Sequence, residues 1–304
     1  MKLIITGDWH IRSSNPENRI DNYEETLWEK LNFICNQEGL LVLQPGDIFD
    51  GPIQSNQLMV RLLKFFNEKK YFKNKVTFSD FGILCCRGQH DLRYRNAGNT
   101  ALDVLAEGGP IKILSDVPYV KEEIHFYGSS FNEEIPEIND ESAFNILVTH
   151  RMIIEEKIWE GQTDYIWANV LLRTTGFALI ISGDNHKGFI VPYKNKLLVN
   201  CGSLLRSSKD QFDHKPFIVI YDTDTRKYEK IFIPIKPASE VFDMEKIERE
   251  EEKNEKLEAF IQGLSEHKEI GLDFQANLFS YMKFNEIEEK VQTIVKENFD
   301  KKEN

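Results

Sequence analysis

The sequence contains few cysteines, no long apolar run and fewer basic than acidic residues. Its four cysteines are irregularly spaced, which excludes a disulfide framework or a CxxC zinc site and predicts reduced, buried thiols. No stretch approaches the ~18 consecutive apolar residues of a membrane span. The N-terminus "MKLIITGDWH" runs into polar residues without a cleavage-type signal. We therefore expect a cytoplasmic protein that has no membrane partner.

The shortage of positive charge argues against a protein that coats nucleic acids nonspecifically. The 304 residues carry 38 Lys+Arg against 50 Asp+Glu, a net charge of −12, whereas binding to phosphate backbones depends mainly on Lys and Arg. Residues 240–304 hold 18 acidic and 10 basic residues, or −8, which leaves −4 for residues 1–239. A nearly balanced body can still present a local basic surface.

The first two-thirds of the chain alternate short apolar runs with helical spacing. Five runs predict buried strands because they are brief, rich in β-branched residues and closed by polar residues or glycine: "KLIIT", "LLVLQ", "FGILCC", "NILVTH" and "FALIIS". Leu27, Leu31 and Ile34 have helical spacing between the first two runs, as does "QLMVRLLKFF" between the second and third. Strand, helix and strand in this order predict an α/β fold with a parallel sheet.

Two later changes in pattern predict further organisation. Beyond Gly188, the runs "FIVPY", "KLLVN", "PFIVIYD" and "KIFIPI" leave little room for helices and predict a second, mostly antiparallel sheet packed on the first. Near residue 238 the composition becomes that of a charged helix, so we place a domain boundary there. Two apolar stripes follow, formed by Leu257, Phe260, Ile261 and Leu264, and by Ile287, Val291, Ile294 and Val295.

Each of the five expected strands is followed by metal-ligating residue types. The strand ends read "GDWH", "PGDIFD", "RGQHD", "TH" and "GDNH". A single Asp or His at a strand end is more often a turn former or helix cap. Here that explanation would have to apply independently at all five strand ends. Ligands collect at the carboxyl ends of strands in α/β sheets. We therefore expect these side chains to meet around two divalent metals: Asp8, His10, Asp47, Gln89, His90, His150, Asp184 and His186.

The order of these motifs resembles that of the calcineurin-like metallophosphoesterase family. Within it, "GDWHIR", "PGDIFD" and "GQHDLRYRN" are similar to the nuclease subunit of the SbcCD-type DNA repair complex, especially its phage-encoded relatives. The resemblance covers roughly residues 1–235. It implies a two-sheet α/β sandwich flanked by helices over residues 1–238, followed by an acidic helical cap or partner-binding segment over residues 239–304.

The resemblance also implies a role for each ligand. One metal would be held by Asp8, His10 and His186, the other by Gln89, His150 and Asp184, with Asp47 bridging both. Two such cations can clamp the attacking and leaving oxygens of a phosphoryl transfer and lower the pKa of a bound water. His90 corresponds to the family's non-ligand histidine, which protonates or stabilises the leaving 3′ oxygen. Asp91 would orient its imidazole and keep it cationic.

Two departures from the family pattern fall on the second metal. Gln89 stands where the family has Asn, and Asp184 stands where it has His. Both replacements are competent ligands, and Asp184 raises the formal ligand charge from −2 to −3. The extra charge favours hard Mn or Mg over Zn and weakens the Lewis acidity of that metal. We expect an active centre with altered metal preference, with manganese as the first choice and magnesium as the alternative.

Substrate contacts follow from two basic stretches. Arg93, Tyr94 and Arg95 offer a phosphate-and-stacking surface, or else form a solvated loop. "NCGSLLRSSKDQ" supplies Ser203, Arg206 and Lys209 where the family approaches the substrate backbone, although Arg206 could equally form a structural ion pair. His125, His214 and His267 have no motif around them and are expected to be structural or surface residues.

Three functions remain open from the sequence. The first is a metal-dependent DNA nuclease with 3′ to 5′ exonuclease and potential single-strand endonuclease activity, working with an SbcC-type, SMC-like ATPase, with a homodimer as a further option. The second is a small-molecule phosphodiesterase or phosphomonoesterase. The third is a catalytically inactive scaffold. The acidic C-terminal helices either pack on the body or grip the ATPase, and their charge suits a basic protein better than DNA. A phage-encoded form would act in the host cytoplasm.

Overall fold

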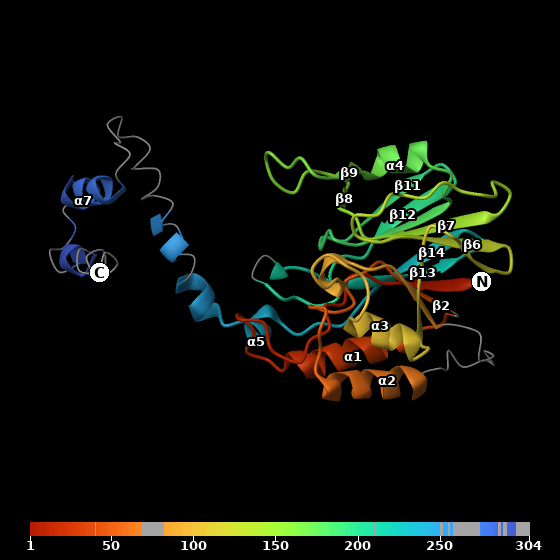
Figure 1. Ribbon diagram of the computed structural model, residues 1–304, viewed down its shortest axis with the longest axis horizontal. Helices are drawn as coiled ribbons and strands as arrows, with labels where there is room; N and C mark the ends of the chain where they lie inside the picture. The colour runs from red at the N-terminus through yellow and green to blue at the C-terminus, as the bar shows by residue number, and fades with distance from the viewer. Residues whose placement is uncertain are drawn as a thin grey trace. The chain divides into compact units, whose positions relative to one another are not determined.

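The computed structural model describes most of the chain (Figure 1). The described residues are 1–39, 41–68, 82–208, 211–249, 252–254, 256–257, 274–284, 287 and 291–295. The chain divides into two compact units, Met1–Phe242 and Asp243–Asn304. The sequence places its boundary near residue 238, and the first unit continues to Phe242. The candidate site lies wholly in this first unit.

Two six-stranded sheets form the centre of the first unit. The first has the order β14-β13-β1-β2-β3-β4 and the second the order β11-β12-β10-β7-β6-β5. Their bounds are β1 Lys2–Ile5, β2 Leu41–Gln44, β3 Ile83–Cys85, β4 Ile111–Ile113, β13 Phe217–Asp222 and β14 Lys227–Phe232 in the first sheet, and β5 Tyr119–Lys121, β6 Ile124–Ser129, β7 Phe144–Thr149, β10 Leu179–Ser182, β11 Phe189–Tyr193 and β12 Lys196–Asn200 in the second. A short pair, β8 Ile153–Ile154 and β9 Ile166–Trp167, stands beside them.

The predicted two-sheet α/β sandwich is confirmed, but its strands are distributed differently from the expectation. The strands after Gly188 do not form a sheet of their own. β11 and β12 extend the second sheet, while β13 pairs antiparallel with β1 and β14 pairs with β13 in the first. β7 and β10 also belong to the second sheet rather than to the sheet of β1, β2 and β3. Apolar runs predict strands but not partners, because any open strand edge can accept the next strand.

Alternation along the strands builds the core. In β1, Leu3 and Ile5 face the layer between the two sheets, and Ile4 faces the helices on the outside. Successive side chains of a strand point to opposite faces, so a strand buried on both sides reads as a continuous apolar run. This explains why "KLII" lacks polar alternation. The sheet edge at the carboxyl end of β1 is therefore held rigidly from both sides.

Helices cover the outer faces of both sheets (Figure 1). α1 Tyr23–Cys35, α2 Asn56–Glu68 and α3 Ala101–Glu107 lie on the first sheet, and α4 Ala168–Thr174 lies on the second. α1 starts where the Asn22 side chain accepts a hydrogen bond from the Glu25 amide. Its predicted apolar stripe of Leu27, Leu31 and Ile34 is buried.

The C-terminal part of the chain is described in pieces. α5 Ala238–Val241 closes the first unit; in the second unit, α7 Phe274–Phe284 and residues 244–249 and 291–295 are helical. Of the first predicted stripe, only Leu257 lies among the described residues. None of the helices within those residues is both long and apolar enough to cross a membrane.

Candidate metal centre

The loops that follow β1 and β2 are fixed to each other by backbone hydrogen bonds. The amides of Trp9 and His10 both donate to the Asp47 carbonyl, at 3.0 and 2.9 Å. On the other side, the Asp8 amide donates to the Gly202 carbonyl at 3.1 Å. These bonds join the carboxyl end of β1 to β2 in its own sheet and to the loop after β12 in the other. The site therefore lies where the ends of the two sheets meet, not along the edge of one sheet.

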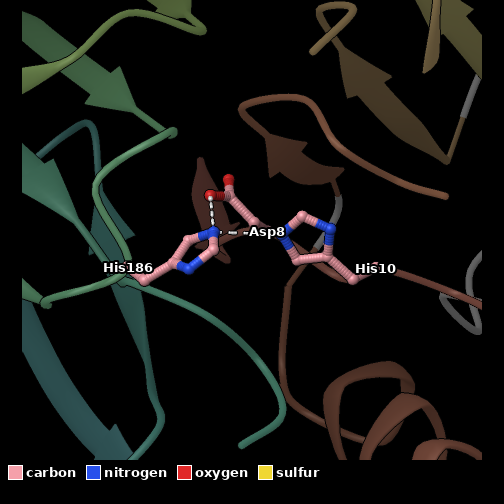
Figure 2. A group of neighbouring side chains, drawn as sticks. All are labelled: Asp8, His10 and His186. Atoms are coloured by element: carbon pink, nitrogen blue, oxygen red, sulfur yellow. Dashed lines mark hydrogen bonds and ion pairs between the residues drawn. The ribbon is translucent and has the colours of Figure 1, made fainter. Parts of the chain in front are cut away.

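Asp8, His10 and His186 form the first cluster (Figure 2). His10 Nε2 lies 3.1 Å from His186 Nε2, and His186 Nε2 lies 3.8 Å from Asp8 Oδ2. One ligand atom of each residue falls within 4.8 Å of the others, a spacing that allows one metal ion to be shared. The sequence assigned these three residues to a single metal, and the structure brings them together.

Asp47 lies between this cluster and His150. Asp47 Oδ2 is 3.9 Å from His10 Nε2 and 3.4 Å from His150 Nε2, and both Asp47 and His150 are completely buried. His150 Nδ1 lies 3.1 Å from the Pro45 carbonyl. If the Nδ1 proton is donated to that carbonyl, the Nε2 lone pair faces Asp47, as a metal ligand requires. The position of Asp47 is the one expected of a bridging carboxylate.

Gln89 and Asp184, the two departures from the family pattern, contact each other. Gln89 Nε2 donates to Asp184 Oδ1 at 3.0 Å, and the Asp184 amide donates to Asp8 Oδ2 at 3.0 Å. The amide nitrogen of Gln89 is thus occupied, while its oxygen Oε1 remains without a hydrogen-bond partner. The longer Gln side chain and the carboxylate that replaced histidine compensate for each other. They leave one amide oxygen available on the second-metal side.

Five buried atoms at this centre have no hydrogen-bond partner among the described residues: Asp8 Oδ1, His10 Nδ1, Asp47 Oδ2, Gln89 Oε1 and His150 Nε2. Leaving a buried polar atom unsatisfied costs about 1–3 kcal/mol, so such atoms rarely cluster without a reason. Carboxylate, amide and imidazole donors are the ligands that Mn and Mg accept. The donor set fits divalent cations.

The electrostatics of the cluster also favour a cation. Burial raises the pKa of Asp8 well above its usual value and lowers the pKa of His10 to about 3. Burial works against a charge on His150 too, but the nearby negative charge of the Asp47 carboxylate outweighs it and raises the pKa of His150 to about 10. For Asp47, burial opposes ionisation, and the contact with His150 more than offsets it, so its pKa is lowered. The negative charges of Asp47 and Asp184 add to the rise in the pKa of Asp8, so a cation among these carboxylates would be stabilised.

Backbone geometry at the ligands is unusual. His10, Asp47 and Asp184 have φ angles of 47°, 49° and 72°, in the left-handed region that few non-glycine residues adopt. Residues held in this region cluster at functional sites, where their surroundings fix them. Glycines give the required room: a Cβ on Gly88 would lie 2.0 Å from Asp47 Oδ1, and one on Gly183 would lie 2.5 Å from Asp8 Oδ1.

His90 and Asp91 lie in the 3-10 helix η1 Gln89–Asp91. The His90 ring stands edge-on to His10, with centroids 5.1 Å apart, beside the first cluster. The expectation that Asp91 orients this imidazole is wrong. Asp91 is fully buried and accepts hydrogen bonds from the amides of Ile48, Phe49 and Gly88, while His90 Nδ1 lies 3.1 Å from the Asp50 carbonyl. Neighbours along a 3-10 turn point in different directions, so Asp91 fastens the loops and Asp50 contacts His90.

Sequence reasoning missed two residues beside the centre. Asp50 Oδ1 lies 3.9 Å from His10 Nδ1, and its other oxygen pairs with Arg12 at 2.7 Å. Its place in "GDIFD", three residues after Asp47, was a signal that could have found it. Gln211 Nε2 lies 3.3 Å from His186 Nδ1. Nothing in the sequence around Gln211 indicates this contact.

The predicted substrate residues divide into exposed and buried groups. Arg93, Tyr94 and Arg95 are exposed, and Tyr94 has 84% of its surface accessible. They form a tight turn directly after η1, where Arg93 and Asn96 exchange backbone hydrogen bonds. Nothing in the structure ties these three side chains to a ligand, and their role in substrate binding stays a prediction.

The second predicted group is buried. Ser203 donates its hydroxyl to the Leu205 carbonyl at 2.6 Å. Arg206 is 6% exposed and donates to the carbonyls of Phe212 and Lys236, at 3.1 and 2.6 Å. These contacts favour the structural alternative for Arg206 over a phosphate contact. Lys209 lies outside the described residues.

These features place the chain in a known family. Residues 1–188 match the model of the calcineurin-like phosphoesterases, so the chain belongs to this family of metal-dependent hydrolases. The chain is 25% identical over 199 residues to the DNA double-strand break repair protein Mre11 of Sulfolobus acidocaldarius. The alignment covers 61% of this chain and 50% of that protein, so the chain spans about half the length of this relative.

Solved structures show likenesses of fold alone. One, described as a novel archaeal phosphodiesterase, is 15% identical with a TM-score of 0.42, over 77% of this chain and 100% of the other. Another, a putative 5′-nucleotidase from Staphylococcus aureus, is 12% identical with a TM-score of 0.46, over 80% of this chain and 56% of the other.

Proposed function

We propose that this chain is a nuclease that uses two divalent metals to hydrolyse phosphodiester bonds at DNA ends. The observation that carries the proposal is the meeting of five strand ends around Asp47, with buried ligand atoms that have no hydrogen-bond partner in the described part of the chain. Within a family of metal-dependent phosphoesterases, such a centre serves phosphoryl-transfer chemistry. The name of the relative, a DNA double-strand break repair protein, supports DNA as the substrate.

Each side chain has a part in this chemistry. Asp8, His10 and His186 would hold one cation, Gln89, His150 and Asp184 the other, and Asp47 both. When bound, the cations supply an activated water and neutralise charge on the phosphate. His90 uses Nδ1 toward the Asp50 carbonyl, which leaves Nε2 to donate a proton to the leaving 3′ oxygen.

DNA would approach along the turn after η1. The exposed side chains of Arg93, Tyr94 and Arg95 follow His90 directly in the chain, and Arg93 lies over the Tyr94 ring at 5.6 Å. Arginine and tyrosine offer phosphate contacts and a stacking surface. Exonuclease activity in the 3′ to 5′ direction, with single-strand endonuclease activity as a second mode, rests on the resemblance to SbcCD-type nucleases. A polymer substrate distinguishes this proposal from a small-molecule phosphodiesterase.

Manganese is the proposed metal and magnesium the alternative. Three carboxylates, those of Asp8, Asp47 and Asp184, converge on the centre, whereas zinc favours sites richer in nitrogen and sulfur.

A partner is proposed for the C-terminal segment. Leu257, Val291 and Ile294 each expose about half of their surface, at 54%, 44% and 52%, within an acidic stretch. An acidic helical surface with exposed apolar residues suits a basic protein such as an SbcC-type ATPase. A homodimer, a cytoplasmic location and a phage origin also stay predictions.

End-labelled duplex DNA incubated with Mn, Mg or Zn tests the nuclease directly. We expect degradation from the 3′ ends with Mn, and about 10²- to 10⁴-fold slower cutting by His90→Ala because its proton transfer is lost. Manganese binding, measured by calorimetry, should persist in that variant. His125→Ala is the matched control, because His125 lies on β6 outside every cluster described here.

One result would reject DNA as the substrate, and another would reject only the role given to His90. The first is hydrolysis of a chromogenic phosphodiester without cutting of DNA, which would indicate the small-molecule alternative. The second is full nuclease activity of His90→Ala, which would leave the assignment of the proton donor without support.

A further inference from the structure

A second cluster of buried charge lies away from the metal centre, beside α1. A cavity of about 180 Å³ opens between α1, the residue Arg19 that precedes it, Arg206 after β12, and the stretch 234–241 that ends in α5. None of its lining residues is a candidate metal ligand. All of them belong to the unit Met1–Phe242.

Four basic residues line this cavity; Lys236 is exposed, and the other three are almost completely buried. Arg19, Lys30 and Arg206 expose only 6%, 5% and 6% of their surfaces. Arginine and lysine are rarely buried unless they are paired. For three buried cations in one cavity, the groups that pair with them must therefore be identified.

The two arginines have partners. Arg19 binds the carboxylate of Asp21 through Nε and Nη2, at 2.8 and 2.6 Å, and donates Nη1 to the Arg206 carbonyl at 2.8 Å. Arg206 itself donates to the carbonyls of Phe212 and Lys236. Only the Asp21 carboxylate brings negative charge to these contacts.

Lys30 has no such partner. Its Nζ is buried and forms no hydrogen bond with the residues that the structure describes, although an ammonium carries three donors. Asp21 is already occupied by Arg19 and by the hydroxyl of Thr26, and Glu29 on the cavity wall is exposed to solvent. Burial, together with the nearby charges of Arg206 and Arg19, lowers the pKa of Lys30 to about 7. When Lys30 is protonated, the cavity therefore has an excess of positive charge and three unused donors.

We propose that this cavity binds a small tetrahedral oxyanion, a phosphate group, on Lys30 between the two arginines. An anion there would accept charge-assisted hydrogen bonds from the ammonium, which are about twice as strong as those between neutral groups. The volume sets the size of the ligand: pockets for drug-sized molecules measure about 300–1,000 Å³, so 180 Å³ admits an ion or one phosphate group but no whole nucleotide. A bound anion would fasten α1 to the stretch before α5.

Calorimetry on the full chain in EDTA, so that the metal centre cannot contribute, tests this site. Inorganic phosphate is titrated in chloride buffer of constant ionic strength. We expect one binding event per chain in the wild type and in Lys30→Arg, and at least about tenfold weaker binding in Lys30→Met, in keeping with a lost charge-assisted contact. Lys64→Met, which removes an exposed lysine on α2, is the matched control and should bind as the wild type does.

Thermal unfolding supplies a second readout if a variant folds poorly. Phosphate should raise the melting temperature of the wild type and of Lys64→Met, and should have little effect on Lys30→Met. Titration with thymidine monophosphate shows whether the ligand is a phosphate ester or free phosphate. Binding of thymidine monophosphate that depends on Lys30 indicates a phosphate ester. Binding of inorganic phosphate without binding of thymidine monophosphate indicates the free ion. Absence of phosphate binding, or equal binding by Lys30→Met, overturns the proposal. Because no metal is present, these outcomes are independent of nuclease activity.

Discussion

The first unit buries two groups of charged side chains of opposite sign. At the sheet ends, Asp8 and Asp47 are surrounded by imidazoles, and the atoms left without partners are mainly acceptors. Beside α1, of the three cations Arg19, Lys30 and Arg206, Arg19 pairs with the Asp21 carboxylate, and the atom left without a hydrogen-bond partner among the described residues is the donor Nζ of Lys30. In each case the unpaired atoms indicate the sign of the ion that would complete the group.

The two groups also differ in how the backbone supports them. The metal ligands follow strands of two sheets, and hydrogen bonds between the loops hold them in place. The cations come from one helix and from irregular segments around it. We therefore expect changes at the metal centre to alter activity steeply, and changes at the cation cavity to alter stability and anion binding without altering the chemistry.

Asp47→Ala should produce the largest loss of activity. A small loss would contradict the expected difference between the metal centre and the cation cavity. Asp47 has a carboxylate oxygen within 4 Å of both His10 and His150, so its loss removes the proposed bridge between the cations. We expect nuclease activity with Mn to fall at least about a thousandfold, at the upper end of the loss of one well-placed stabilising group. Asp116→Ala, in an exposed loop, serves as the control, and an active Asp47→Ala would reject the two-metal centre.

Gly88→Ala tests whether close packing against Gly88 positions the proposed bridging carboxylate of Asp47. Its Cβ would come 2.0 Å from Asp47 Oδ1 and 2.4 Å from the Asp47 amide nitrogen, so the loop must move. We expect manganese affinity to fall about 10- to 100-fold, the range for disturbing the support of a ligand. Calorimetric titration with Mn measures this. Gly51→Ala in the same region is the control because its Cβ would meet no atom within 4 Å, and unchanged affinity in Gly88→Ala would count against the geometry described here.

Asp184→His sharpens the account of the second metal. The change restores the imidazole of the family pattern and reduces the converging carboxylates to two. The ratio of activity with Zn to activity with Mn should therefore rise about tenfold. Such a shift follows from ligand hardness and charge. Activity is compared across Mn and Zn titrations, with the exposed Asp164→His as control. Identical titrations for Asp184→His and wild type would show that Asp184 does not reach the metal.

Lys30→Met should have the smallest effect, on stability rather than activity. The pKa of Lys30 is about 7 in the folded chain and about 10.4 when unfolded, so below pH 7 the fold carries the full cost of a buried ammonium. That cost shrinks as the pH rises from 7 toward 10. The charged groups facing it are Arg19, Arg206, Glu29 and His214.

Urea unfolding in phosphate-free buffer at pH 7 and pH 9 measures this dependence. Wild type should gain stability relative to Lys30→Met on going to pH 9, by an amount on the order of a few kcal/mol, since each pKa unit corresponds to about 1.4 kcal/mol. A constant difference between the two chains would show that Lys30 keeps its proton in the fold.

Most of the fold class and the candidate ligand types could be predicted from the sequence. Buried strands read directly as "KLII" or "LIIS", because apolar residues on both faces leave no polar alternation. Residues such as Asp8 and Asp47 could be singled out because they follow those strands. What could not be predicted was the partner of each strand: β7 and β10 lie in the other sheet, since hydrogen-bonded edges carry no sequence code.

The contacts of individual side chains could not be predicted from the sequence either. The role expected for Asp91 was wrong because a 3-10 turn directs it toward the amides of Ile48, Phe49 and Gly88, away from His90. Arg206 was read as a candidate phosphate contact, while the structure gives its donors to two carbonyls in the interior. Gln211 was overlooked because only the fold brings it to His186.

By itself, the sequence determined which chemical groups the chain can offer and that they follow strands, because apolar periodicity and residue type are local properties. Only the tertiary structure decided which of these groups meet. The distances between Asp47, His10 and His150, and the isolation of the Lys30 ammonium, depend on two sheets and a helix packing against one another. Burial away from water, which makes an unpaired charge costly, exists only after that packing.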